Sequence, residues 1–172
     1  MLNILEYNEE VLFVKEPVIN ICQKDISFLK ERAKRTKRGR IRLCAHSDIS
    51  ESIHEMIIVH PQNAYIRPHK HIGKTESAHI IEGSINVLIF TETGDISNTI
   101  KMNDCSSGDN FYCRMPSGLY HSMLIKSDWL VFLETTKGPF KKEDTVFAPW
   151  APKENDTNMV RKFVSELHNR IK

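Results

Sequence analysis

The stretch MIIVHPQNAYIRPHKHIGKTESAHIIEGSINVLIF, residues 56–90, decides the fold class of this chain. Four short segments in it are rich in β-branched and aromatic residues: 56–60, 65–67, 79–81 and 84–90. Turn residues separate these segments, as in Pro61-Gln62-Asn63 and Glu82-Gly83. Short segments of this composition between turns are typical of β-strands. The stretch therefore predicts consecutive strands.

The same pattern continues toward the C-terminal side. WLVFLE at 129–134 predicts another strand, and HSMLI begins one at residue 121. Turn signals recur at 93–95, 107–109 and 116–118 with no helical pattern between them. This spacing is typical of an all-β sandwich or barrel, so we expect a mainly antiparallel sheet.

The two ends of the chain have a helical pattern instead. Residues 22–38 and residues 157–172 each carry apolar side chains at spacings of three and four. The expected N-caps are Asp25 or Ser27 for the first helix and Asp156 or Thr157 for the second. We therefore expect a helix on either side of the strands.

Length and composition indicate one globular domain. A chain of 172 residues with 40% hydrophobic and 27% charged residues suffices for one core and is too apolar for a disordered protein. We expect residues 1–50 to form an extension packed on the barrel and residues 51–136 to form the barrel. A proline-rich segment and the C-terminal helix then occupy residues 137–172.

Nothing in the chain resembles a membrane or secretion signal. No apolar run approaches the roughly 18 residues that span a bilayer. The N-terminal stretch MLNILEYNEEVLFV carries adjacent acids where a secretory signal carries basic residues. The four cysteines form no C-x-x-C pair, so we expect reduced thiols. We predict a cytoplasmic protein that does not contact a membrane.

Residues 30–42, KERAKRTKRGRIR, form a basic block with eight Lys and Arg and one acid, although the net charge of the chain is only +2. Such a block can be the solvated face of a helix end, an anion site or a nucleic-acid footprint. The interleaved aromatic residues and overall basicity of a nucleic-acid binder are missing. We expect no nucleic-acid partner, and the other two interpretations stay open.

Four residues have the chemistry and spacing of a metal site. His69 and His71 lie two residues apart in an extended stretch, so their side chains share one face. Glu76 follows a short connection in which Gly73 can supply the positive φ of a tight turn. His121 begins a strand that can close the site. Three imidazoles and a carboxylate suit one divalent ion of Fe, Mn, Ni, Co or Zn, and suit Ca²⁺ poorly.

Other residues are candidates for substrate binding or catalysis. Tyr65 and Arg67 share the strand parity of the two histidines, so they can bind oxygen or phosphate groups of a substrate, or form a salt bridge at the barrel mouth. Lys74 and Glu134 are candidates for proton transfer or for supporting the site, with solvated charge as the alternative. His79 has the opposite parity to Glu76, and we do not expect it to be a ligand.

The ligand segment also resembles a known motif. RPHKHIGKTE at 67–76, followed by Gly83, matches the first cupin motif: H-x-H, four residues, E, six residues, G. The region from Gly108 to His121 resembles the second motif, although its spacing is longer and Ile125 stands where the motif usually ends in asparagine. The resemblance implies an all-β cupin double-stranded β-helix, a jelly-roll barrel.

A narrower resemblance points to one cupin family. RPHKH-x-GK-x-E, together with KGPF at 137–140 and FAPWAP at 147–152, is similar to the WbuC family of cupin-fold metalloproteins, over about residues 35–155. Members are typically encoded among genes for O-antigen and other surface polysaccharides. This implies a bacterial setting in lipopolysaccharide or related sugar chemistry. Cupin relatives often pair, so we expect a homodimer.

Two classes of function follow. In the first, the metal activates a carbohydrate or sugar-nucleotide substrate, water or dioxygen, in an isomerase, epimerase, lyase or dioxygenase reaction. In the second, the chain is a non-catalytic metal- or sugar-binding module with a regulatory role, since one barrel fold carries enzymes and binding domains alike. The sequence leaves open whether the chain is an enzyme.

Overall fold

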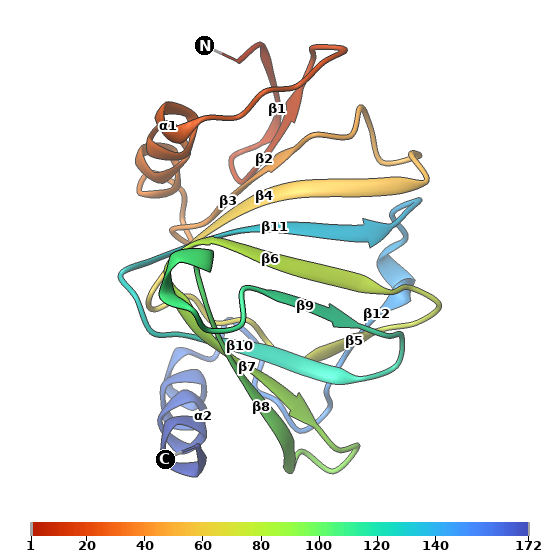
Figure 1. The fold of residues 1–172 in the computed structure, drawn as a ribbon. Helices are drawn as coiled ribbons and strands as arrows, with labels where there is room; N and C mark the ends of the chain where they lie inside the picture. The colour runs from red at the N-terminus through yellow and green to blue at the C-terminus, as the bar shows by residue number, and fades with distance from the viewer. Residues whose placement is uncertain (1, 172) are drawn as a thin grey trace.

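The structure, a computed structural model that describes residues 2–171, consists of strands with two α-helices (Figure 1). The first six strands are β1 (Ile4–Asn8), β2 (Val11–Val14), β3 (Ile41–Cys44), β4 (Ile53–Pro61), β5 (His69–His71) and β6 (Glu76–Glu82). The next six are β7 (Ser84–Phe90), β8 (Ile96–Asn103), β9 (Tyr112–Met115), β10 (Tyr120–Ile125), β11 (Trp129–Lys137) and β12 (Thr145–Phe147). The helices are α1 (Gln23–Ala33) and α2 (Thr157–Arg170), and short 3₁₀ turns lie at Cys105–Ser107 and Lys142–Asp144.

The strands form two sheets. One has the order β1-β2-β3-β4-β11-β6-β9, and the other has the order β12-β5-β10-β7-β8. The ladders are antiparallel except that β2 pairs with β3 in parallel. The prediction of a mainly antiparallel all-β architecture is confirmed. Segment 65–67, which we predicted as a strand, has no regular structure and leads directly into β5.

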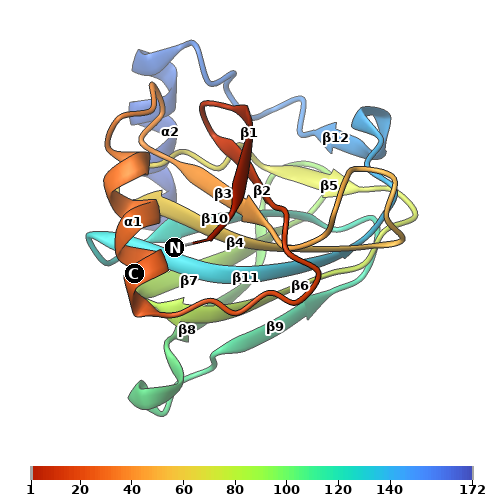
Figure 2. The same cartoon turned by 90° about the horizontal axis from the view of Figure 1, so that it is seen from above.

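The N-terminal extension is part of the larger sheet. The strands β1, β2 and β3 add to it beside β4, so the extension contributes strands as well as the predicted helix (Figure 2). The sequence pattern does not predict these strands. They are four or five residues long, and β1 and β2 have no clear alternation of buried and exposed residues.

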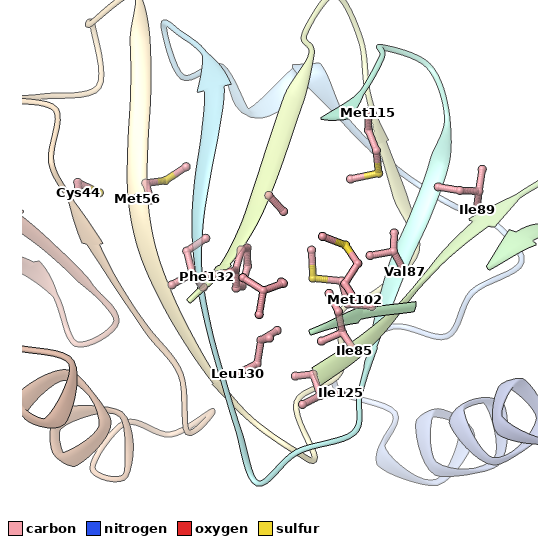
Figure 3. Packing of buried hydrophobic residues seen from close by; sticks show 14 of the residues in the cluster. Cys44, Met56, Ile85, Val87, Ile89, Met102, Met115, Ile125, Leu130 and Phe132 are labelled. Carbon is pink, nitrogen blue, oxygen red and sulfur yellow. The ribbon is translucent and has the colours of Figure 1, made fainter. Parts of the chain in front are cut away.

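The core lies between the two sheets. Met56 from β4 and Phe132 from β11 point inward from the larger sheet, while Ile85 and Val87 come from β7 of the smaller one (Figure 3). Each of these side chains is buried. Burying an apolar side chain of this size contributes about 1.5–3 kcal/mol relative to leaving it exposed. Near the other end of these strands the inner face carries polar side chains, and the candidate site lies there.

Helix α1 covers the outer face of the larger sheet. Its buried face of Ile26, Leu29 and Ala33 is the predicted one, and it packs in one cluster with residues of β2, β3, β4 and β11. The predicted N-cap is wrong. Cys22 is the cap, and the Asp25 carboxylate, at the third helical position, accepts a hydrogen bond from its backbone N–H at 2.9 Å. Asp25 therefore stabilises the first turn from inside the helix.

Helix α1 ends at Ala33, whereas the sequence pattern extends to residue 38. Thr36 stops it: its N–H and its hydroxyl both donate to the Ala33 carbonyl at 3.0 Å. The hydroxyl also lies 3.0 Å from the Arg40 carbonyl, which turns the chain toward β3.

Helix α2 covers the outer face of the smaller sheet. Its N-cap is Asp156, one of the two predicted residues, whose carboxylate accepts from the Met159 N–H at 3.1 Å. Leu167 is buried in one cluster with Leu88 of β7 and Leu124 of β10. Within residues 2–171, no helix has the length and apolar character needed to cross a membrane.

Candidate metal centre

Three histidines from two neighbouring strands meet at one point. His69 and His71 lie on β5 with their side chains on the same face, as their spacing predicts. In the antiparallel pairing of β5 with β10, His121 lies directly opposite His69. One ring nitrogen from each of the three side chains lies within 4.8 Å of the others. The three imidazoles can therefore reach one ion.

Glu76 approaches this cluster from the other sheet. The connection between β5 and β6 turns at Gly73, whose φ of 69° confirms the predicted tight turn. Glu76 then begins β6 with its side chain turned inward and buried. Its Oε1 lies 2.7 Å from His121 Nε2, and its Oε2 lies 3.1 Å from His71 Nε2. The carboxylate thus contacts two of the three imidazoles.

Hydrogen bonds hold together the two loops that carry the ligands. The Gly118 N–H donates to the His71 carbonyl at 2.8 Å, and the Ser117 hydroxyl donates to the same oxygen at 3.0 Å. The Gly73 N–H in turn donates to the Ser117 hydroxyl oxygen at 2.8 Å. The loop after β5 and the loop before β10 are therefore linked beside the histidines.

In each histidine, the hydrogen bond at one ring nitrogen determines that the other ring nitrogen faces the cluster. His69 Nδ1 lies 2.9 Å from the Arg67 carbonyl, and His121 Nδ1 lies 3.0 Å from the Leu119 carbonyl. A carbonyl only accepts, so each Nδ1 carries a proton and donates it. His71 Nδ1 lies 3.2 Å from the hydroxyl of Thr145 on β12. All three rings therefore turn Nε2 toward the shared point, as metal-binding histidines with outer hydrogen-bond partners do.

Glu76 and His121 shift each other's pKa. His121 has two acceptors, the Leu119 carbonyl on Nδ1 and the Glu76 carboxylate on Nε2. Burial lowers the pKa of His121, but the hydrogen bond and charge of Glu76 outweigh it, and the pKa lies above its usual value. Burial likewise raises the pKa of Glu76, while hydrogen bonds from His121 and His71 hold it well below its usual range. Burial and the neighbouring His121 lower the pKa of His69 to about 4.

This arrangement fits a divalent transition metal. The proton between Glu76 and His121 balances a buried carboxylate, and a cation bound at the same point balances that charge equally well. Neutral imidazole nitrogens and a carboxylate are the borderline donors that Fe, Mn, Ni, Co and Zn prefer. Metal binding by His69, His71, Glu76 and His121 remains a prediction.

The cluster opens onto a cavity of about 540 Å³ inside the barrel. The three histidines and Glu76 line one side of it, and apolar side chains such as Phe13, Met56, Ile58 and Phe132 line much of the rest. A ligand in this cavity would contact the predicted metal and an apolar wall at the same time.

Glu134 also lines this cavity. On β11 it pairs with Ala78 of β6 and with Met56 of β4, so its side chain points to the inner face, two rows from Glu76. Its carboxyl group forms no hydrogen bond or ion pair with the other described residues (2–171). Burial, and then the charge of Glu76, raise the pKa of Glu134 to about 7. Among the four catalytic candidates, Glu134 is thus a titratable group within the cavity that has no structural partner.

Tyr65 and Arg67 are occupied by the segment after β12. The Tyr65 hydroxyl donates to the Pro152 carbonyl at 3.0 Å, and the side chain does not line the cavity. Arg67 lines the cavity, but its Nη2 lies 3.3 Å from both the Ala148 and Ala151 carbonyls. Its guanidinium also stacks 4.8 Å from the centre of the Phe147 ring. Both residues hold this segment in place, which is a structural role beside the predicted substrate contact.

Lys74 is engaged in a similar way. Its ammonium group donates to the Pro139 carbonyl at 2.6 Å and pairs with Asp144 at 3.2 Å, although the side chain lines the cavity. His79 is exposed and packs against Phe111, away from the cavity, as its parity predicts.

Sequence reasoning missed Thr145 and Arg42. Thr145 orients His71 from β12, a strand of only three residues that leaves no readable alternation. Arg42 was included in the basic block without distinction, yet it lines the cavity. The alternation of Arg42 with buried Ile41 and Leu43 is visible in the sequence and is the signal that could have separated it from its neighbours.

Comparison with known proteins gives little functional information. Residues 21–102 match a family model described as a domain of unknown function, DUF6016. No curated protein matches the chain.

Several solved structures are similar to the chain. A Shewanella oneidensis protein from structural genomics aligns with a TM-score of 0.51 at 12% identity, over 72% of this chain and 77% of that one. The cupin domain of Schizosaccharomyces pombe Cnp3 aligns over 59% of this chain and 66% of its own, with a TM-score of 0.45 at 17% identity.

Oxalate decarboxylase of Bacillus subtilis aligns with a TM-score of 0.46 at 28% identity, over 58% of this chain. The present chain spans only 25% of that enzyme's chain. With its two mainly antiparallel sheets, the chain has an all-β cupin jelly-roll fold with a C-terminal helix.

Proposed function

We propose that this chain is a metal-dependent cupin enzyme, with one divalent transition metal held by His69, His71, Glu76 and His121. The observation that carries the proposal is the common orientation of the three rings. Each Nδ1 is held by a carbonyl or hydroxyl partner, and each Nε2 faces one point beside the Glu76 carboxylate. A structural metal site is usually closed, whereas this point opens onto the cavity.

The chemistry follows from the cavity and the groups in it. A bound metal would supply a Lewis acid with open positions for a substrate oxygen, water or dioxygen. Glu134 is placed to hold or accept a proton, because its carboxyl lies inside the cavity with a pKa raised to about 7 by burial and by Glu76. The apolar wall excludes water from the carbon skeleton of the ligand.

The substrate class rests on the resemblance of the ligand segment and residues 137–152 to the WbuC family. This resemblance supports a carbohydrate-derived or sugar-nucleotide substrate in surface-polysaccharide synthesis. An isomerase, epimerase, lyase or dioxygenase reaction is compatible with the site. The homodimer and the cytoplasmic location also remain predictions.

The alternative is a non-catalytic module that binds a metal or a sugar. The engagement of Tyr65, Arg67 and Lys74 in structural contacts favours it, because these three catalytic candidates have partners already. Glu134, which lines the cavity with a pKa raised to about 7, favours the enzyme hypothesis.

Elemental analysis tests the metal site directly. We expect protein purified without added metal to contain close to one equivalent of a transition metal, and we expect His71→Ala to lose it. His79→Ala is the matched control, because His79 is an exposed histidine on β6 whose ring packs against Phe111 and does not line the cavity, so the substitution should leave the metal content unchanged. Equal metal content in the wild type and His71→Ala would refute the proposed site.

An activity assay tests the hypothesis that the chain is an enzyme. The metal-loaded wild type is incubated with a panel of sugar nucleotides and the products are separated by chromatography. We expect Glu134→Gln to keep the metal and lose most of the turnover, typically 10²–10⁴-fold for a general acid or base. Metal binding without turnover of any panel member would support the non-catalytic module instead.

A further inference from the structure

The basic block at residues 30–42 is largely neutralised in the folded chain. Five of its eight cations form ion pairs: Lys30 with Glu82, Arg32 with Glu6, Lys34 with Glu31, and both Arg38 and Arg40 with Glu10 and Glu154. Within residues 2–171, Arg35, Lys37 and Arg42 form no ion pair. Most of the block is therefore a paired surface, which leaves little free charge for a nucleic acid.

Arg42 differs from the other two unpaired cations in its position. All three side chains are exposed, but Arg35 and Lys37 lie outside the cavity, whereas Arg42 is part of its lining. On β3, Arg42 and Cys44 share the inner face, and Leu43 between them packs under α1. The side-chain contact that Arg42 makes is a weak one, with Met56 Sδ at 3.7 Å from Nη1. A guanidinium thus faces the cavity with most of its donors unused.

A second polar atom without a partner lies near Arg42. His60 on β4 lines the same cavity, and its Nδ1 is buried without a hydrogen-bond partner. The charge of Arg42 is one of the causes that lower the pKa of His60, after burial and Arg40, which places the two side chains in one electrostatic environment. Arg40 and Glu154, which also line the cavity, pair with each other. Arg42 is therefore an unpaired cation in the cavity lining, beside a neutral ring with unused hydrogen-bonding capacity.

The strand register places Arg42 across the larger sheet from the histidine cluster. Arg42 pairs with Ile58 on β4, and that row continues through Phe132 on β11 to Ile80 on β6. Glu76 lies four residues before Ile80. With strands about 4.8 Å apart and residues about 3.4 Å apart along a strand, the two Cα atoms are roughly 20 Å apart over the sheet. Both side chains reach inward from these positions, and Glu134 lies between them.

We propose that Arg42 forms an anion subsite for the substrate of the metal centre, so that the substrate is a small organic molecule with a carboxylate or phosphate group. The anionic group binds Arg42, the apolar wall of Met56 and Ile58 covers the middle of the molecule, and its other end reaches the histidine cluster. The role in substrate binding rests on the proposed function, whereas anion binding at Arg42 does not. A guanidinium pairs with either oxyanion in a bidentate way, which gives orientation as well as affinity.

The test measures binding of inorganic phosphate and of benzoate by titration calorimetry at constant ionic strength. Both probes are titrated into the full-length wild type, Arg42→Gln, Arg35→Gln and His71→Ala. Arg35→Gln removes the same charge from the same block but outside the cavity, so it controls for long-range electrostatics. His71→Ala controls for binding of the probes at the histidine cluster.

We expect Arg42→Gln to weaken binding of the preferred probe about tenfold or more, as the loss of a charge-assisted contact does. Arg35→Gln and His71→Ala should stay within about twofold of the wild type, since each leaves the Arg42 guanidinium intact. Tighter binding of phosphate would assign a phosphate ester, and tighter binding of benzoate would assign a carboxylate.

Three results would overturn the subsite: no saturable binding to the wild type, unchanged binding to Arg42→Gln, or an equal loss in Arg35→Gln. Failure of the proposed function is seen separately. If the purified protein holds no metal but Arg42→Gln still weakens probe binding, the anion subsite is supported and the proposed enzyme function is refuted. If the protein holds metal but Arg42→Gln binds the probes as the wild type does, the metal site is supported and the anion subsite is refuted.

Discussion

His60 is a buried ionisable side chain whose neutral form the fold requires. It lies on the inner face of β4, 8% exposed, with its ring tilted against Phe132 at 5.9 Å between centroids. Burial, and after it the charges of Arg40, Arg42 and Arg38, lower the pKa of His60 to about 3. In the unfolded chain the ring titrates near its ordinary value of 6.5. Between these two pH values the unfolded chain binds a proton that the folded chain does not.

Stability should therefore fall as the pH drops below 6.5, because protons then favour the unfolded state. From about pH 7 to about pH 5.5 this one residue should lower the free energy of unfolding by about 1 kcal/mol. His60→Leu removes the titration, so its loss over the same interval should be smaller by that amount. Urea unfolding at the two pH values measures both, and an identical loss in the two proteins would contradict the assignment.

The two helices show how much of the fold is encoded in the local sequence. In α2, a carboxylate at the N-cap and an apolar stripe were both readable from the sequence, and the helix begins where they predict. In α1 the stripe was correct, but Asp25 occupies the third helical position because the cap itself is Cys22. A single acidic residue marks a first turn without specifying which position it takes within that turn.

The capping of α2 can be tested by substitution. Asp156→Ala removes the acceptor for the Met159 N–H and should lower the free energy of unfolding by about 1 kcal/mol. Asp156→Asn is the matched variant, because asparagine is about as good an N-cap as aspartate, and it should stay close to the wild type. Chemical denaturation of the three proteins decides it, and equal losses in both variants would show that the charge and not the cap matters.

The metal-ligand segment was predictable for a different reason. Strand parity joined His69 to His71, and Gly73 indicated the turn that returns the chain at Glu76. Parity failed for Tyr65, which does not line the cavity, whereas Arg67 lines it as parity predicts. The strand does not extend back to either residue, and both side chains bind carbonyls of the segment after β12. Those partners are more than 80 residues distant in the chain, and no local pattern encodes such contacts.

At the scale of the whole molecule, the cavity is a joint product of regions that looked separate. The histidines come from the smaller sheet, Glu76 and Glu134 from the neighbouring strands β6 and β11 of the larger one, and Arg42 from the N-terminal extension. The extension therefore completes the inner wall in addition to covering the outer face with α1 (Figure 2). Residues 1–50 thus contribute directly to the candidate site, a role that the sequence division into extension and barrel did not suggest.

The fold should survive removal of the metal. The core between the sheets and the two helix-packing clusters consist of apolar residues, none of them a predicted ligand. We expect the circular dichroism spectrum of the chelated protein to match that of the metal-loaded one. Its melting temperature should be lower, because a ligand that binds only the folded state adds stability that grows with its concentration.

The variants separate this effect from nonspecific action of the chelator. In His71→Ala the melting temperature should not respond to added metal, whereas His79→Ala, which leaves the cluster intact, should respond as the wild type does. Thermal unfolding followed at a β-sheet wavelength, with and without metal, gives all three responses. If chelation instead abolished the β-sheet signal of the wild type, the ion would be part of the fold, as in small zinc domains, and the open catalytic centre proposed here would lose its basis.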